Sequence, residues 1–175
     1  MRIVCVGGGP AGLFFSILMK RADPDHEIVV IERNPPDVTY GFGVVFSDAT
    51  LGEIAAADAV TYEEITRAFH HWDDIDIHYR GEVLSSTGHG FSGIARVELL
   101  RILTARAESL GVGLRFGEEV GSLAELPEAD LVVGADGVNS VVRRLREEHF
   151  RPRIDLRSNR YAWLGTTRPF PAFTF

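Results

Sequence analysis

The sequence contains one cysteine, no long hydrophobic run and no low-complexity segment. The single cysteine, Cys5, excludes an internal disulfide and favours a reducing compartment. The longest apolar runs, such as residues 13–19, are far shorter than the roughly 20 residues that a membrane-spanning helix needs. The N-terminus enters a strand-like segment at once, with no signal-peptide pattern. We therefore expect a cytoplasmic protein without a membrane partner.

An excess of positive charge is also missing, since the formal net charge is −7, which argues against a general nucleic-acid binder. The distribution is uneven, with nine acidic residues in the segment 48–82 and seven arginines in the segment 143–160. The arginine-rich segment fits a small molecule that carries phosphate. It also fits a solvated helix face, because Glu147 and Glu148 lie inside it. With 45% apolar residues, the chain is long enough for a domain with a real core.

The order of the apolar segments predicts an α/β fold of the Rossmann type. Residues 2–6 read as a buried strand that ends at glycine, residues 11–21 have helical character, and residues 27–31 read as a second strand. Such a βαβ unit has parallel strands and a right-handed crossover. Further elements of this domain are expected as a helix over 96–110, strands over 112–116 and 130–134, and a helix over 139–148.

A long excursion over residues 35–95 interrupts this pattern. Ser47 or Asp48 can cap one helix, and the capping box Thr61-x-x-Glu64 predicts the start of a second helix that ends near His71. Alternating apolar and polar residues around the turn at 80–82 predict a β-hairpin. Beyond this domain, residues 161–167 and 171–175 have the character of strands from a second sheet.

A glycine pattern follows the first strand and opens the first helix, as Gly7-x-Gly9-x-x-Gly12. In a dinucleotide site, the first glycine allows the tight turn, the second lets the backbone approach a pyrophosphate, and the third lets the helix pack closely. The helix N-terminus then supplies free N–H groups to the phosphates. Glu32 ends the second strand twenty residues after Gly12, where a carboxylate accepts hydrogen bonds from ribose hydroxyls.

A second motif indicates which dinucleotide, FAD or NAD, the glycine pattern would bind. The pattern Asp130-x-x-x-Gly134-Ala135-Asp136-Gly137-x-x-Ser140-x-x-Arg143 closely resembles the "DG" segment of the group A flavoprotein monooxygenases, the FAD-dependent aromatic ring hydroxylases. The segment 7–12 resembles the first motif of that family, and Arg96 matches the arginine that precedes the family's long helix. As a dipeptide alone, Asp136-Gly137 is also compatible with a turn that caps the last helix.

The fingerprint and the resemblance together assign cofactor contacts to twelve residues. They are Gly7, Gly9, Pro10, Ala11, Gly12, Glu32, Arg33, Gly43, Arg96, Ala135, Asp136 and Gly137. The resemblance implies FAD as cofactor, NADH or NADPH as co-substrate, and O2 and a small aromatic molecule as substrates. It names no catalytic side chain, and no histidine pattern predicts a metal site.

Three further segments, 40–48, 88–93 and 159–167, resemble the branch of salicylyl-CoA 5-hydroxylases and 2-aminobenzoyl-CoA monooxygenases. This resemblance implies an aromatic acyl-CoA thioester as substrate. It divides the chain into an FAD-binding domain (residues 1–155, with the excursion) and the first strands of a truncated substrate domain (residues 156–175). Because the family's later "GD" motif is not in the sequence, we expect an N-terminal fragment that is inactive alone.

Three alternatives to this function remain open. A flavin-dependent reductase or halogenase shares the same FAD domain but uses other chemistry. An NAD-dependent dehydrogenase fits the glycine pattern but not the DG segment. A non-catalytic nucleotide-binding remnant would pack against a partner through exposed strand edges. The oligomeric state and the choice between NADH and NADPH are left open.

Overall fold

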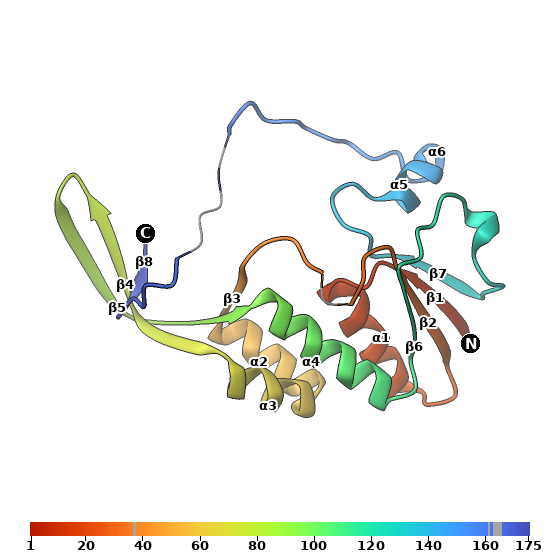
Figure 1. Cartoon of the computed structure of the whole chain (residues 1–175), viewed down its shortest axis with the longest axis horizontal. Helices are drawn as coiled ribbons and strands as arrows, with labels where there is room; N and C mark the ends of the chain where they lie inside the picture. The colour runs from red at the N-terminus through yellow and green to blue at the C-terminus, as the bar shows by residue number, and fades with distance from the viewer. Residues whose placement is uncertain (37, 161, 163–165) are drawn as a thin grey trace. The chain divides into compact units, whose positions relative to one another are not determined.

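A computed structural model describes residues 1–36, 38–160, 162 and 166–175, and Figure 1 shows the course of the chain. The elements, in chain order, are β1 (Arg2–Val6), α1 (Pro10–Ala22), β2 (Glu27–Glu32), β3 (Gly43–Ser47), α2 (Asp48–Ala57), α3 (Ala59–Ala68), β4 (His70–Tyr79), β5 (Glu82–Ala95), α4 (Arg96–Ser109), β6 (Gly113–Phe116), the short 3-10 helix η1 (Leu123–Glu125), β7 (Leu131–Gly134), α5 (Val141–Leu145), α6 (Glu147–Phe150) and β8 (Phe173–Thr174).

The chain divides into two compact units, residues 1–39 with 100–161 and residues 40–99 with 162–175. The first unit contains a four-stranded sheet in the order β6-β2-β1-β7, and every neighbouring pair is parallel. Helix α1 packs on β1 and β2 (Figure 1). This arrangement confirms the predicted α/β class and the parallel βαβ unit.

The core of the first unit explains why β1 reads as an unbroken apolar run. Parallel strands buried on both faces need apolar side chains at successive positions. In β1, Ile3, Val4, Cys5 and Val6 are each at most 5% exposed. On one face of the sheet, Val4, Val6 and Ile31 pack against Val120 and Val142, two residues from loops and helices that follow much later in the chain.

The second unit contains a sheet in the order β3-β5-β4-β8. Strands β4 and β5 form the predicted hairpin, and the turn between them holds Arg80 and Gly81 at φ 51° and 85°. Two consecutive positive φ values match the type I′ turn that suits the twist of a hairpin. Strand β8, near the end of the chain, pairs in parallel with β4, which confirms strand character in the segment 171–175.

Two predicted details are wrong. Thr61 does not cap α3, because Asp58 begins the helix and its Oδ2 accepts from the Thr61 N–H (3.2 Å) and hydroxyl (2.6 Å). The helix over 139–148 is two short helices that meet at Arg146, whose φ and ψ of −121° and 26° interrupt the helical path. The predicted strand over 161–167 lies mostly outside the described residues, and the boundary at 155/156 stays a prediction.

None of the helices among the described residues combines the length and the apolar character that a bilayer crossing requires. The longest, α4, has fourteen residues and carries charged side chains along its length.

Candidate cofactor-binding site

The glycine loop, residues 7–12, connects the C-terminal end of β1 to α1. Gly7 has φ +110°, and its N–H donates to the carbonyl of Ile31 at 2.8 Å. A Cβ at Gly7 would lie 2.4 Å from the Ala135 carbonyl oxygen, and a Cβ at Gly12 would lie 2.0 Å from the Gly7 oxygen. Neither position has room for a side chain, so the protein itself requires glycine at both.

Gly9 differs from these two glycines, because a Cβ built there meets nothing within 4 Å. Gly9 is the N-cap of α1, where it provides no side-chain cap, and Pro10 follows in the first turn. The first turn carries no acidic residue. The leading N–H groups of a helix lack intrahelical partners and attract anions. Open space above Gly9 and an uncapped helix start therefore form a cradle that fits a phosphate group.

Glu32 closes one side of this cradle at the C-terminal end of β2. Its Oε2 accepts from the Gly8 N–H at 2.8 Å, and its Oε1 accepts from the N–H and the Nδ2 of Asn34 at 2.8 and 2.7 Å. Arg33 follows it and is exposed. The carboxylate is therefore held against the glycine loop at the place where the fingerprint predicts a ribose partner.

The DG loop, residues 134–140, lies beside the glycine loop because β7 pairs with β1. Asp136 Oδ1 accepts from the Ser140 hydroxyl at 2.6 Å, and Oδ2 accepts from the N–H groups of Val141 and Val142. Gly137 has φ +82° and turns the chain toward α5. The carboxylate of Asp136 therefore organises the turn into α5, while Ala135 contacts Gly7 directly.

Two further candidates, Gly43 and Arg96, belong to the second unit and lie together there. Gly43 begins β3 opposite Ala95, and the Arg96 N–H donates to the Phe42 carbonyl at 3.0 Å. A Cβ at Gly43 would lie 3.1 Å from the Ile94 carbonyl oxygen, so close strand pairing favours glycine. The structure thus brings ten of the twelve candidates together around the two loops of the first unit and brings the other two together in the second.

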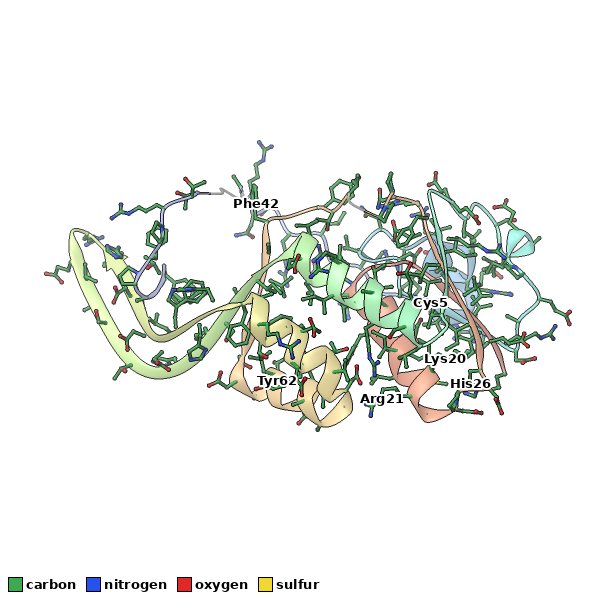
Figure 2. The ribbon with its side chains drawn as sticks, turned by 60° about the horizontal axis from the view of Figure 1, so that its bottom comes forward. Cys5, Lys20, Arg21, His26, Phe42 and Tyr62 are labelled. Carbon is green, nitrogen blue, oxygen red and sulfur yellow. The ribbon has the colours of Figure 1, made fainter. Side chains whose placement is uncertain are left out.

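Cys5, labelled in Figure 2, is fully buried and contacts the glycine loop. Its Sγ lies 3.9 and 3.8 Å from the carbonyl oxygens of Gly7 and Gly12. Burial raises the pKa of the Cys5 thiol to about 11, and the nearby Asp136 carboxylate adds to the rise. The thiol is therefore neutral at physiological pH.

A cavity of about 450 Å³ lies at the opposite end of the same sheet, around the N-terminal ends of β1 and β2. Lys20 and His26, both labelled in Figure 2, line it. The Lys20 Nζ donates to the Pro24 carbonyl at 2.7 Å, and this contact stabilises the turn between α1 and β2. The buried His26 Nδ1 lies 3.2 Å from the Asp23 carboxylate but makes no hydrogen bond among the described residues.

Within the described part of the chain, no three His, Cys, Asp or Glu side chains gather as a metal site would require. The arginine-rich segment 143–160 does not form a single helix face, because it runs through α5, α6 and a stretch without helix or strand. Arg143 and Arg144 donate to the carbonyls of Val138 and Asn139 and so stabilise the DG loop.

Sequence reasoning missed two residues of the site, Gly8 and Asn34. A Cβ at Gly8 would lie 2.8 Å from the Glu32 Cβ, so the middle glycine makes room for the carboxylate. The signal for Gly8 was its place as the second of three consecutive glycines, a position that the Gly-x-Gly-x-x-Gly fingerprint does not use. Asn34 carried no signal beyond its place two residues after Glu32.

Comparison with known proteins agrees with this geometry. The sequence profile of the FAD binding domain family matches residues 1–161. Over its whole length the chain is 48% identical to salicyloyl-CoA 5-hydroxylase of a Streptomyces species, of which it covers 34%. It is 33% identical, again over its whole length, to 3-hydroxy-4-methyl-anthranilyl-(aryl-carrier protein) 5-monooxygenase of Streptosporangium sibiricum, of which it covers 49%.

A solved structure of 2-methyl-3-hydroxypyridine-5-carboxylic acid oxygenase matches with a TM-score of 0.72 and 25% identity, over 82% of this chain and 41% of that one. The structure of PqsL in complex with 2-aminobenzoylacetate, at 22% identity and a TM-score of 0.70 over 92% of this chain and 48% of that one, supports the fold alone.

The chain spans between about a third and a half of the length of the curated relatives that it matches. The family resemblance expected from the two motifs is confirmed over nearly the whole chain. The chain belongs to the FAD binding domain family, with FAD as its cofactor.

Proposed function

We propose that this chain is the FAD-binding part of a flavin-dependent monooxygenase that hydroxylates an activated aromatic ring at the expense of NADH or NADPH. The substrate we propose is an aromatic acyl-CoA thioester of the salicyloyl or 2-aminobenzoyl type. The observation that carries this proposal is the 48% identity with a salicyloyl-CoA 5-hydroxylase, which extends over the whole chain.

The residues of the two loops fit FAD in a specific way. The open space above Gly9 and the N-terminus of α1 would receive the pyrophosphate, and Glu32 would accept the adenosine ribose hydroxyls. The bound flavin supplies the redox chemistry that activates O2. The contribution of this chain is to hold the pyrophosphate and the ribose in place, with the glycine loop and the DG loop fixed against each other.

The test is an absorbance spectrum of the purified full-length protein, before and after addition of salicyloyl-CoA and NADPH. A flavin spectrum that bleaches faster with the acyl-CoA, together with a hydroxylated thioester as product, is the expected result. A rate of flavin bleaching that is the same with and without the acyl-CoA would reject the acyl-CoA as the substrate. A protein that takes up no flavin, even after reconstitution, would reject the monooxygenase.

A second substrate class has specific support. The relative from Streptosporangium sibiricum acts, by its name, on an aromatic acid bound to an aryl-carrier protein, and it is 33% identical to the whole chain. The same test with salicylate loaded on an aryl-carrier protein separates the two classes. Faster bleaching with the carrier protein than with acyl-CoA would favour the second. The cytoplasmic location expected from the sequence remains part of the proposal.

A further inference from the structure

The two oxygens of the Glu32 carboxylate accept different numbers of hydrogen bonds. Oε1 accepts two hydrogen bonds, both from Asn34, whereas Oε2 accepts one, from the Gly8 N–H, among the residues that the structure describes. A carboxylate offers about four acceptor sites, two on each oxygen. Oε1 is therefore saturated, and Oε2 keeps one site that can accept from a ligand hydroxyl.

Asn34 is itself held in place from the backbone. Its carbonyl accepts from the Gly117 N–H at 3.3 Å, and the carbonyl of Glu32 accepts from the Glu118 N–H at 3.1 Å. Pro35 follows, and a residue before proline is restricted to extended conformations. These restraints fix the Asn34 backbone while its side-chain amide donates to Glu32 at 2.7 Å. Because the acceptor is a carboxylate, only the amide nitrogen can face it.

We propose that Asn34 is a positioning residue that holds the Glu32 carboxylate so that Oε2 accepts a ribose hydroxyl of the adenosine part of FAD. The inference rests on the proposed FAD site and adds a residue that the glycine fingerprint does not contain. A glutamate side chain has several rotatable bonds, and ordering it in advance lowers the entropy lost on binding. Asn34 performs this ordering by a fork of two hydrogen bonds to one oxygen.

The experiment measures affinity for FAD and for an FAD analogue that lacks both adenosine ribose hydroxyls, by quenching of flavin fluorescence in the purified full-length protein. Asn34→Ala should weaken FAD binding about tenfold and leave binding of the analogue unchanged. In a Glu32→Ala background, Asn34→Ala should have no further effect on either ligand. Asn159→Ala, at an exposed asparagine in the stretch without helix or strand after α6, is the matched control.

The variant Asn34→Asp adds a readout that a packing role would not change. It keeps the shape of the side chain but sets a second carboxylate against Glu32, and like charges at this distance raise the pKa of one of the pair. FAD affinity of this variant should recover as the pH falls and the two groups share a proton. The affinity of the wild-type protein should change less over the same range.

Several results would overturn the inference. They are an equal loss of affinity for FAD and the analogue, no loss for either, or a full loss for Asn34→Ala in the Glu32→Ala background. In each of these cases the wild-type protein still binds FAD, so the proposed function stands while the positioning role does not. Absence of flavin binding in the wild-type protein would instead overturn the proposed function itself, and the positioning role with it.

Discussion

At the scale of single residues, Gly9 and Gly12 have different reasons to be glycine. A side chain at Gly12 would collide with the Gly7 carbonyl, whereas a side chain at Gly9 would enter open space. The protein itself thus requires glycine at position 12, and we propose that the ligand requires glycine at position 9. On this proposal, the fingerprint contains one position that controls folding and one that controls binding.

Substitution of the two glycines should separate these effects. Gly12→Ala should lower the free energy of unfolding by about 3 kcal/mol, because a Cβ has no room beside backbone atoms. Gly9→Ala should change it by less than about 1 kcal/mol, since Gly9 has φ −73° and alanine is tolerated there. Gly9→Ala should instead weaken FAD about tenfold or more. Urea unfolding without FAD and fluorescence titration with FAD measure the two quantities. Wild-type FAD affinity in Gly9→Ala would contradict the assignment.

The single thiol offers a second test at this scale. With its pKa raised to about 11 by burial, Cys5 should be neutral and unreactive in the folded protein at pH 8. A thiol reagent such as DTNB should label less than a tenth of the protein in an hour, and all of it in denaturing urea. Rapid labelling without denaturant would mean that the first strand opens, because Cys5 pairs with both β2 and β7.

At the scale of secondary-structure elements, Asp58 links two helices. It is both the C-cap of α2 and the N-cap of α3, and it is 1% exposed.

Asp58→Ala should lower the free energy of unfolding by about 2 kcal/mol, because it removes a helix cap and leaves the buried Thr61 hydroxyl without this acceptor. Ser47→Ala removes the exposed cap of α2 and should cost about 1 kcal/mol or less. Asp58→Asn, which keeps an acceptor, should restore part of the loss. Equal costs for the two alanine variants, measured by urea unfolding, would argue against a buried linking role.

Asp58 also shows where sequence reasoning was limited at this scale. The pattern Thr61-x-x-Glu64 satisfies the rule for a capping box, but Asp58 lies three residues earlier and its carboxylate accepts from the Thr61 N–H, so the helix begins there. The parallel strands, by contrast, could be predicted because buried strands carry continuous apolar runs. The glycine positions and Glu32 could be predicted from the residue spacing of the dinucleotide fingerprint. The hydrogen bonds of Asn34 were not, since they depend on how residues 117 and 118 hold the chain after β2.

At the scale of the whole molecule, strand order decides which motifs meet. The glycine loop and the DG loop are more than 120 residues apart in sequence, yet both follow neighbouring parallel strands. Carboxyl ends of parallel strands meet at one edge of a sheet, so the two loops are adjacent by topology. At the other end of the same two strands, Arg2 holds them together through Glu128 and Asp130.

This contact makes the stability of the fold depend on pH in a defined direction. The Arg2 N–H donates to Asp130 at 2.7 Å and lowers the pKa of that carboxyl, and the Arg2 guanidinium lowers the pKa of Glu128 by hydrogen bonding and charge. A carboxyl whose pKa is lower in the folded state stabilises the fold above its unfolded pKa of about 4. That contribution disappears as the pH falls through the lower folded-state value.

The double variant Glu128→Gln with Asp130→Asn should therefore be less stable than wild type at pH 7 and should lose less stability between pH 7 and pH 3. Because the groups are exposed, the effect should be small and should shrink in high salt. Urea midpoints by far-UV circular dichroism at the two pH values measure it, with Glu53→Gln on the exposed face of α2 as a control for the loss of a charge. If the double variant loses as much stability in acid as wild type does, the contact contributes nothing to the acid sensitivity.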